Sequence, residues 1–496
     1  MKSSLIEQLT LYKYRYQIGY GLLILIPAIM LFAQLGSLTP TVGPLEAQSA
    51  LKNLDIGSIA DNPVNGPYRL MQYASIQAFG PTPWAARLPS VIFGLVLLVS
   101  LFALLKLWHS ERIAILGTLL VASSSWFLSY ARLGTPAITL AAMLVLLLLA
   151  TARFHHDEAT GGRSFVLLVL IVALAAYTPL MSYFVILALV FHYQLLRQHL
   201  GKISLQHWLL GGLALVIALA PLGRAMWLSP GIIRELMGWP LGSLSIIDLF
   251  VNTTEAFGSV FWRAQPFAQI HLGNLAMLDI FTASMTALGL YHYERHYDHH
   301  RTQLLVVGAV TMLLGIGLSG NMSSLIVLLP FAYIFAATGI ITLLAQWYTI
   351  FPQNPIARSV ALIPMTLLLV VVGIYHTDRY FIAWARSPET KRAYTVDPLL
   401  LKRSVDSLKA NNDKLLIVTN ENIDQIQFLL SDTAPQLTFE VPHSGSNTRY
   451  RSYDYIFVAP TTHMVGIIKK QLNASPQIIA SPSATQPVAY YRFDLK

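Results

Sequence analysis

Long apolar runs alternate with short polar segments along most of the chain. The clearest runs offer roughly 17–21 mainly apolar residues each, which is the length that an α-helix needs to cross the hydrocarbon core of a bilayer. These runs are 17–35, 88–108, 113–130, 135–154 and 303–320. Further candidates are 165–178, 183–196, 207–224, 275–292, 324–347 and 359–376. The pattern predicts an α-helical integral membrane protein with about eleven transmembrane helices.

Beyond residue 376 the long apolar runs stop and charged residues become more frequent, so we place a domain boundary there. Short apolar runs at the expected strand spacing alternate with two amphipathic stretches in the tail. The predicted strands are 414–419, 437–441, 455–459, 477–480 and 489–495, and the predicted helices are 421–430 and 461–472. The chain thus divides into a membrane domain, 1–376, and a small α/β domain, 377–496. No glycine-rich phosphate loop follows the first strand, which predicts a packing or docking module and no nucleotide site.

The lysines and arginines between the apolar runs predict the orientation of the chain. One set lies in the short segments on one side of the predicted spans, and that side is therefore cytoplasmic. Its members are Lys2, Lys13, Arg15, Lys106, Arg112, Arg153, Arg163, Arg197, Lys202, Arg295, Arg301 and Arg358. With an odd number of spans, the N-terminus is cytoplasmic, and the loops 36–87 and 225–274 lie outside together with the C-terminal domain.

Composition narrows the class further. Only 11% of the residues are charged and 55% are hydrophobic, as expected for a membrane protein. The net charge of +9 is explained by cytoplasmic anchors that meet anionic lipid headgroups, so we predict no nucleic-acid partner. The chain has no cysteine, which excludes thiolate chemistry and cysteine-based metal sites. We expect a multi-pass protein of the inner (cytoplasmic) membrane, with an uncleaved first span in preference to a signal peptide.

The two outer loops are the candidate functional regions. Loop 36–87 alternates polar and apolar residues at helical spacing, which predicts short helices that lie in the interface and cover a cavity. Loop 225–274 carries Trp227, Trp239 and Trp262, which are typical of an aromatic belt at headgroup level. These rings could also stack on a sugar or contact an isoprenoid chain.

The stretch Asn62 to Ser90, NPVNGPYRLMQYASIQAFGPTPWAARLPS, runs directly into a predicted span. It resembles the first outer loop of the GT-C glycosyltransferases that use polyprenyl-phosphate sugars, the class of the protein O-mannosyltransferases and the aminoarabinose transferases. The segment 380–394 is similar to the linker after the last span of that family. The resemblance implies direct inverting transfer of a sugar from a polyprenyl phosphate to an acceptor on the outer face, without a metal, nucleotide or other cofactor.

The chemistry of this transfer needs a carboxylate that deprotonates the acceptor and cations that stabilise the departing phosphate. At the place of the family's Asp-Glu pair stands Leu45-Glu46, which makes Glu46 the candidate base. A structural role for Glu46, such as capping a loop helix or pairing with Lys52, is the alternative. Arg132 matches a family arginine at the outer end of the third span, but Ala137 stands where its acid is expected. The further candidates for phosphate or substrate binding are Arg69, Tyr68 and Arg263.

The departures from the family motifs keep a second function open. The segment 321–330, NMSSLIVLLP, lacks the family's cation, as the two acid positions lack their carboxylates. A catalytically inactive relative that binds lipid or glycan, or that serves as a scaffold for other membrane subunits, fits these departures. A transporter is disfavoured because no inverted repeat is visible.

Two histidine-rich segments were weighed as metal sites. The run 291–301, YHYERHYDHHR, places His292 and His296 one helical turn apart, and 155–158 reads HHDE. Both fall on the side predicted to be cytoplasmic, away from the proposed cavity. We therefore predict polar ends of spans there and no metal.

Overall fold

The structure is a computed structural model that describes residues 14–156, 161–240, 242, 245–265, 267–295, 300–351, 355–408, 413–432, 437–441, 450–482 and 487–495. It divides into two compact units. The first comprises Met1–Ala33, Gly57–Leu70 and Ser90–Trp384. The second comprises Gln34–Ile56, Met71–Pro89 and Ala385–Lys496. The helices α6 (Gly66–Phe79) and α7 (Pro83–Trp108) contribute residues to both units, as does α5 (Ile56–Asp61) through its first residue.

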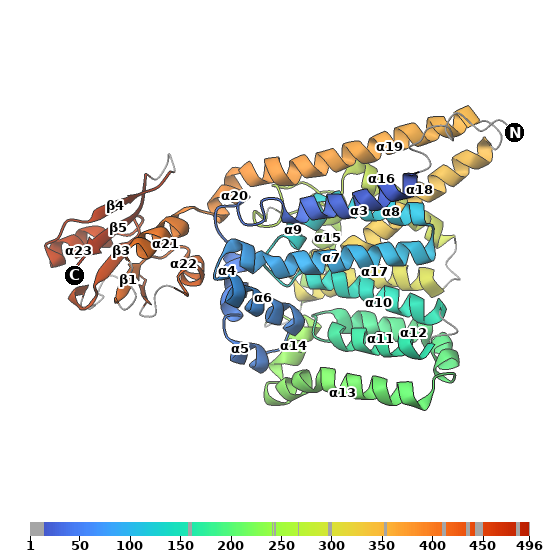
Figure 1. Ribbon diagram of the computed structural model, residues 1–496, viewed down its shortest axis with the longest axis horizontal. Helices are drawn as coiled ribbons and strands as arrows, with labels where there is room; N and C mark the ends of the chain where they lie inside the picture. Colours follow the sequence, from blue (N-terminus) through green and yellow to red (C-terminus); the bar gives the residue numbers. More distant parts are fainter. Residues whose placement is uncertain are drawn as a thin grey trace. The chain divides into compact units, whose positions relative to one another are not determined.

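The first unit is a bundle of helices. In chain order it contains α3 (Arg15–Phe32), α5 (Ile56–Asp61), α8 (Glu111–Ser123), α9 (Ser125–Ala131), α10 (Ile138–His156), α11 (Gly161–Ala175), α12 (Met181–Leu200), α13 (Leu205–Leu228), α14 (Gly231–Met237), α15 (Ile246–Phe261), α16 (Ile280–Glu294), α17 (His300–Ser319), the 3₁₀ helix η1 (Met322–Leu328), α18 (Leu329–Ile350), α19 (Pro355–Asp378) and the π-helix η2 (Arg379–Trp384). Figure 1 shows α10, α11, α12, α13 and α17 packed side by side in this bundle.

Six of the described helices are long and apolar enough to cross a membrane, or seven if the bent pair α8 and α9 is one span. Every range predicted as a span coincides with a helix or with such a broken pair. Shorter apolar helical segments add to these, among them Gly162–Ala175 of α11 and Met181–Phe191 of α12. The protein is a multi-pass membrane protein, as predicted, and the count of about eleven spans stays a prediction.

Three irregular helix ends shape one end of the bundle. The chain bends by 66° between α8 and α9, because Ser124 leaves the helical conformation and its hydroxyl accepts a hydrogen bond from the Phe127 N–H. Asp279 caps the start of α16 in the same manner, through the Thr282 N–H. Helix α19 changes into the π-turns of η2 at Arg379. Such π-turns inside helices occur frequently at functional sites.

Two glycines bring α16 and α18 into unusually close contact. A Cβ atom on Gly289 would lie 1.8 Å from the Phe335 carbonyl oxygen, and one on Gly339 would lie 2.0 Å from the Met285 carbonyl oxygen. Thr286 adds a hydrogen bond from its hydroxyl to the Ala332 carbonyl, at 3.1 Å. The small residues therefore let the two backbones touch, and this fixes the position of Asp279 at the start of α16.

The second unit contains a mixed five-stranded sheet of order β2-β1-β3-β5-β4. The strands are β1 (Leu415–Val418), β2 (Leu437–Glu440), β3 (Tyr455–Val458), β4 (Gln477–Ala480) and β5 (Val488–Asp494). The pairs of β1 with β2 and β3 are parallel, and β5 pairs antiparallel with β3 and β4. The helices are α20 (Pro388–Ala393), α21 (Asp397–Ser407), α22 (Ile423–Leu429), α23 (Met464–Leu472) and the 3₁₀ turn η3 (Tyr450–Ser452).

Side chains that alternate along the strands build a core on each face of this sheet. Leu415 and Ile417 of β1 pack with residues of α21 and α22, whereas Leu416 and Val418 pack with residues of α23. The short apolar run that predicted β1 is therefore apolar at every position because both faces of the strand are buried. The prediction of a helical membrane protein with a small C-terminal α/β domain is confirmed.

The first outer loop contributes α4 (Pro44–Lys52) to the second unit. Ala47 and Ala50 of α4 pack against Ile76 of α6 and against Phe428 and Leu429 of α22 in one buried cluster. The side-chain amide of Gln425 in α22 donates to the Val42 carbonyl at 2.9 Å. The short helices predicted for this loop exist, and one of them is part of the core that holds the C-terminal sheet domain.

Candidate functional site

Glu46, the predicted general base, lies in a buried ion pair of the second unit. Its carboxylate accepts hydrogen bonds from Arg87 Nε at 2.8 Å and from a terminal nitrogen of Arg87 at 2.9 Å. It also accepts the Gly43 N–H at 2.7 Å, which completes a capping box at the start of α4. Glu46 is fully buried and only 4% of Arg87 is exposed. The carboxylate is therefore held by a cation and by a helix N-terminus.

Arg87 has acceptors on all sides. Besides Glu46, it donates to the Leu35 carbonyl at 2.9 Å, to the Thr39 hydroxyl at 2.7 Å and to the Thr41 carbonyl at 3.0 Å. Its guanidinium also lies 5.9 Å from the ring centroid of Tyr394. This arrangement, the Arg87–Glu46 clamp, fastens residues 35–46 to the start of α7. The sequence left capping of a loop helix open as an alternative role of Glu46, and the structure shows this cap.

Arg69 and Tyr68 are occupied by contacts inside the first unit. Half-buried Arg69 donates to the Asn62 carbonyl, and its second terminal nitrogen lies 3.5 Å from the Ser58 carbonyl and hydroxyl oxygens. Burial lowers the pKa of Arg69, and Glu235 counteracts this effect. Tyr68 is fully buried, with its hydroxyl 2.8 Å from the Ser90 hydroxyl. Both side chains hold the segment 57–70 in place.

Arg132 is buried at the C-terminus of α3. It donates to the carbonyl oxygens of Met30, Leu31 and Ala33 at 2.6, 3.2 and 2.7 Å, so it satisfies the last acceptors of that helix. Its guanidinium carbon lies 5.5 Å from the ring centroid of Tyr380, over the aromatic face.

Arg263, in contrast, is exposed, and its backbone forms an isolated antiparallel bridge with Leu275.

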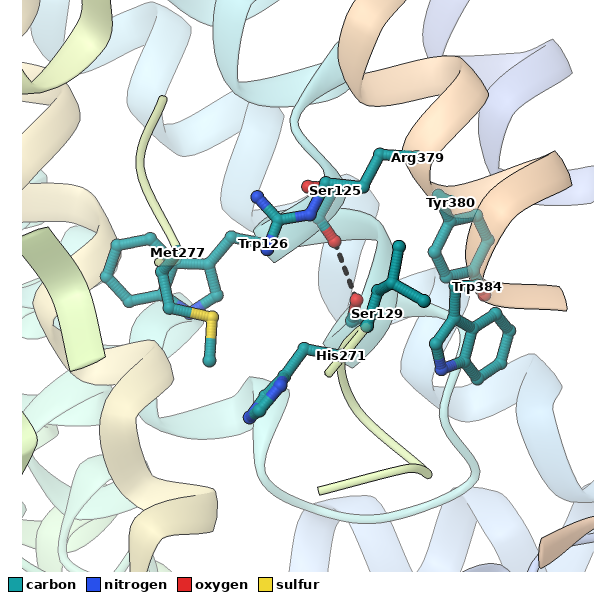
Figure 2. A pocket seen from close by; sticks show the side chains of 9 residues that line it. Ser125, Trp126, Ser129, His271, Met277, Arg379, Tyr380 and Trp384 are labelled. Carbon is teal, nitrogen blue, oxygen red and sulfur yellow. Dashed lines mark hydrogen bonds between the residues drawn. The ribbon is translucent and has the colours of Figure 1, made fainter. Parts of the chain in front are cut away.

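A small, partly open polar pocket lies in the first unit where the irregular helix ends meet. It is lined by Ser125, Trp126, Ser129, His271, Leu272, Met277, Arg379, Tyr380 and Trp384. Figure 2 shows these side chains converging from α9, from the loop 262–279 and from η2. The pocket is called the Arg379 pocket below. None of the five residues predicted from the sequence lines it, so their roles in binding or catalysis stay predictions.

Arg379 provides the positive charge of this pocket. The π-helix η2 carries it, only 6% of the residue is exposed, and a terminal nitrogen lies 3.4 Å from the Leu275 carbonyl oxygen. Among the carboxylates that the structure describes, none forms an ion pair with it. A buried guanidinium that faces a polar cavity in this way attracts an anion.

His271 faces the same pocket as a neutral imidazole. Its Nδ1 lies 3.2 Å from the Gly273 carbonyl, which can only accept, so Nδ1 carries the proton and Nε2 keeps its lone pair. Burial lowers the pKa of His271, the bond to Gly273 partly offsets this effect, and the charge of Arg379 adds to it, so that the pKa lies at about 4. At neutral pH the pocket therefore holds one positive charge, on Arg379.

The walls of the pocket include one buried donor with an unused hydrogen-bonding capacity. Trp126 is 1% exposed, and its indole N–H has no acceptor in the described part of the chain. Trp384 donates its own indole N–H to the Ala268 carbonyl at 2.8 Å. Tyr380 and Trp384 stack with ring centroids 5.1 Å apart and an interplanar angle of 10°. The pocket thus joins a cation, a vacant N–H donor and a flat aromatic surface.

Behind the pocket wall runs a chain of buried polar side chains. The hydroxyl of Ser125 lies 2.9 Å from His376 Nδ1, and His376 Nε2 lies 3.0 Å from Asp279 Oδ2. The other carboxylate oxygen of Asp279 accepts the Thr282 N–H. Ser129 donates its hydroxyl to the Ser125 carbonyl at 2.7 Å, which is the dashed line in Figure 2.

The histidine-rich segments are only partly described. Residues 157–158 and 296–299 lie outside the described residues, so the pairing of His292 with His296 has no structural counterpart here. Within the described residues, no group of three or more His, Asp or Glu side chains is placed to hold a metal ion.

The chain is similar to known proteins in one segment and in its fold. Residues 62–227 match the model of the dolichyl-phosphate-mannose-protein mannosyltransferase family. The fold is similar to that of ArnT from Cupriavidus metallidurans in the apo state, with a TM-score of 0.61 and 13% identity over 96% of this chain and 98% of ArnT. The form of ArnT bound to undecaprenyl phosphate gives 0.60 and 13% over 95% and 97%.

A more distant likeness is to the oligosaccharyltransferase of Archaeoglobus fulgidus tethered with an acceptor peptide containing the NVT sequon. The TM-score is 0.50, with 14% identity over 86% of this chain and 64% of that one. No curated protein matches the chain in sequence.

These findings show a fold similar to that of ArnT and a segment similar to the mannosyltransferase family. The resemblance to the GT-C glycosyltransferases that was predicted from the sequence is confirmed, and the family model matches residues 62–227.

Sequence reasoning missed the residues that line the pocket. Arg379 directly precedes the segment 380–394, and a cation at the polar end of the last span was a signal that could have found it. His271 and Asp279 lie in or just after the outer loop that was considered only for its tryptophans and acids. No pattern in the sequence brings Ser125 and His376 together, because they are 251 positions apart.

Proposed function

We propose that the protein binds the phosphate of a polyprenyl-phosphate sugar in the Arg379 pocket and transfers the sugar to an acceptor hydroxyl. The observation that carries this proposal is the buried guanidinium of Arg379 facing a polar cavity without a described carboxylate partner. A phosphate supplies the negative charge that the guanidinium lacks, and a guanidinium binds two phosphate oxygens at once.

The other walls of the pocket fit the same ligand. The free indole N–H of Trp126 can donate to a phosphate or sugar oxygen. The stacked rings of Tyr380 and Trp384 offer a flat apolar surface for a sugar ring or for the first isoprene units. Arg132 lies over Tyr380 and holds that ring in place, so we assign it a positioning role instead of phosphate contact.

The chemistry of the transfer follows from these groups. As the bond between the anomeric carbon and the phosphate oxygen breaks, negative charge grows on the phosphate, and the buried guanidinium of Arg379 stabilises that charge. The donor class is supported by ArnT, a protein of the same fold that has been seen bound to undecaprenyl phosphate.

We further propose that the transfer takes place on the outer face of the inner membrane. The N-terminus is then cytoplasmic, and the C-terminal domain lies outside. This orientation is supported by the lysines and arginines between the apolar runs.

A second function is favoured by one observation. In the described part of the chain no carboxylate lines the Arg379 pocket, and the Glu46 carboxylate is held by Arg87. A catalytically inactive relative would bind the lipid phosphate in the same pocket and present it, or a glycan, to other membrane subunits. The two functions share the binding step and differ only in turnover.

Binding is tested with purified protein in nanodiscs and undecaprenyl phosphate as the probe. Arg379→Met keeps the volume of the side chain and removes its charge, so we expect affinity to fall at least about tenfold, since a charge-assisted bond contributes more than about 1.4 kcal/mol. The matched control is Arg386→Met, which removes an exposed arginine in the linker and should leave binding unchanged. Equal affinity of wild type and Arg379→Met would remove the pocket from donor binding.

Turnover is tested separately. Wild-type protein is supplied with a panel of undecaprenyl-phosphate-linked sugars, and the release of undecaprenyl phosphate is measured. Release that is lost in Arg379→Met supports the transferase, whereas binding without release supports the inactive relative.

A further inference from the structure

Three buried polar residues from distant parts of the first unit form one hydrogen-bonded chain. Ser125 begins α9, His376 lies near the end of α19, and Asp279 caps α16. The distances are 2.9 Å from the serine hydroxyl to His376 Nδ1 and 3.0 Å from His376 Nε2 to the Asp279 carboxylate. His376 is fully buried, and only 9% of the Asp279 side chain is exposed.

The partners fix the direction of these hydrogen bonds. The Asp279 carboxylate accepts from the Thr282 N–H through one oxygen, and an ionised carboxylate can only accept through the other. His376 Nε2 must therefore carry the proton that it donates to Asp279. Neutral His376 then has its lone pair on Nδ1, where it accepts the O–H of Ser125.

This order is that of a Ser-His-Asp triad, with the two ring nitrogens exchanged. The carboxylate holds the imidazole in one tautomer, and the imidazole makes the serine oxygen a ready proton acceptor. Such a chain is not needed to satisfy the fold, because Asp279 already caps α16 and a serine hydroxyl can bond to its own helix, as Ser129 does.

Only one end of the chain reaches the Arg379 pocket. Ser125 lines the pocket, whereas His376 and Asp279 lie behind it. The second pocket serine, Ser129, uses its proton to bond to the Ser125 carbonyl and has no contact with the histidine. Of the two pocket serines, Ser125 is the one whose hydroxyl lies within hydrogen-bond distance of a histidine.

We propose that Ser125, His376 and Asp279 form the proton relay that deprotonates the acceptor in the Arg379 pocket. The proposal rests on the proposed transferase function. It supplies a base for the acceptor, which is needed because no described carboxylate lines the pocket. Ser125 is the catalytic residue that touches the acceptor, and His376 and Asp279 act through it.

The step balances as follows. The acceptor hydroxyl gives its proton to the Ser125 oxygen while the Ser125 proton moves to His376 Nδ1. The electron pair of the acceptor oxygen forms the bond to the anomeric carbon, and the bond from that carbon to the phosphate oxygen breaks with its pair on the phosphate. Asp279 stabilises the resulting imidazolium, and Arg379 faces the phosphate. The proton returns through Ser125 to the departing phosphate.

The decisive variant is Asp279→Asn. Asparagine is as good an N-cap as aspartate and can still accept the Thr282 N–H, so α16 keeps its start. Its amide N–H₂ then faces His376 Nε2 and forces the proton onto Nδ1, where it blocks the Ser125 O–H. We expect release of undecaprenyl phosphate from its linked sugars, with water or short alcohols as acceptors, to fall roughly 10²–10⁴-fold.

Two readouts separate this role from a structural one. Binding of undecaprenyl phosphate should stay within about twofold of wild type, because Arg379 is unchanged. Nitrogen-15 NMR of histidine-labelled protein should show the proton of His376 on Nε2 in wild type and on Nδ1 in Asp279→Asn. Ser284→Ala is the matched control, because this exposed serine bonds to the Ile280 carbonyl of its own helix and does not line the pocket; it should leave turnover within a few-fold of wild type.

The outcomes are distinct. Turnover that survives Asp279→Asn or Ser125→Ala overturns the relay while the proposed donor site stands. The relay is equally overturned when Asp279→Asn loses lipid binding together with turnover, since the pair is then structural, or when the wild type binds lipid without turnover. Wild type that does not bind undecaprenyl phosphate removes the proposed function itself, and the relay with it.

Discussion

Two buried arginines, one in each compact unit, make opposite use of the same side chain. Arg87 in the second unit is surrounded by acceptors and paired with the Glu46 carboxylate at 2.8 Å. Arg379 in the first unit bonds to one carbonyl at 3.4 Å and lines a polar pocket. The exposed fractions are nearly the same, 4% and 6%.

The difference shows that burial alone does not indicate a binding residue. A guanidinium has five N–H donors, and its function depends on how many of them the protein itself satisfies. In the Arg87–Glu46 clamp, both the donors and the charge are matched inside the unit, so nothing remains for a ligand. At Arg379 no described carboxylate forms an ion pair, and the Asp279 carboxylate acts on the charge only from beyond ion-pair distance, so a ligand can complete the site. The comparison therefore assigns stability to the first arginine and binding to the second.

The largest expected effect is on stability, at Arg87. Arg87→Met leaves the Glu46 carboxylate buried without its cation, and removal of one partner of a buried pair costs about 3–5 kcal/mol. Denaturant titration of the detergent-solubilised protein should show this loss in the free energy of unfolding. Arg379→Met should cost less than about 1 kcal/mol in the same measurement, because it removes a charge that forms no ion pair with a described carboxylate.

The double variant Arg87→Met, Glu46→Leu checks the cause. Replacement of both partners by apolar residues removes the orphaned charge, so much of the lost stability should return. If the double variant is as unstable as Arg87→Met, the contacts of Arg87 with Leu35, Thr39 and Thr41 are the source of its stability, and the ion pair is not.

A smaller loss is expected for Glu46→Gln, and this variant also tests the role predicted from the sequence. The glutamine keeps the shape and the bond to the Gly43 N–H but leaves the Arg87 charge unbalanced, which costs about 1–3 kcal/mol. If Glu46 serves only in the Arg87–Glu46 clamp, turnover by the folded fraction of Glu46→Gln stays near that of the wild type. A fall in turnover of roughly 10²–10⁴-fold in fully folded protein would instead make Glu46 the general base.

The sequence predicted elements where one periodic signal determines them. Each predicted strand of the C-terminal domain coincides with a strand, because alternating residues fill the two cores of the sheet. The long apolar runs coincide with helices, because apolar side chains are buried in lipid or in protein along the whole length of each run. In contrast, the continuation of α19 through η2 to Trp384 carries no periodic signal, because a π-turn inserts one residue into the helical repeat.

The site was harder to predict than the fold. Glu46 and Arg132 were identified by their positions relative to the family motifs. Sequence position does not reveal which residues a side chain contacts in the fold, and these contacts determine its role. Arg87 lies 41 positions from Glu46, and its own role was not predicted. The Arg379 pocket is assembled from α9, the loop 262–279 and η2, which are brought together only by tertiary packing.

The smallest expected effect is a change in the titration of His271 when the charge of Arg379 is removed. Burial lowers the pKa of His271 from 6.5 to about 4, and Arg379 contributes to this lowering. A histidine whose pKa is lowered on folding stabilises the folded state fully at pH values above its ordinary pKa of 6.5. This contribution is lost as the pH falls from 6.5 to about 4. In Arg379→Met the pKa of His271 should rise and stay below 6.5, since burial, the larger cause, remains. Nitrogen-15 NMR of labelled histidines, with His271→Gln to assign the signal, measures both pKa values.

Arg386→Met should leave the titration of His271 as in wild type, because the Arg386 side chain is exposed in the linker. A His271 pKa that is the same with and without Arg379 would show that the arginine charge is already balanced inside the pocket, and the contrast between Arg379 and Arg87 would be lost.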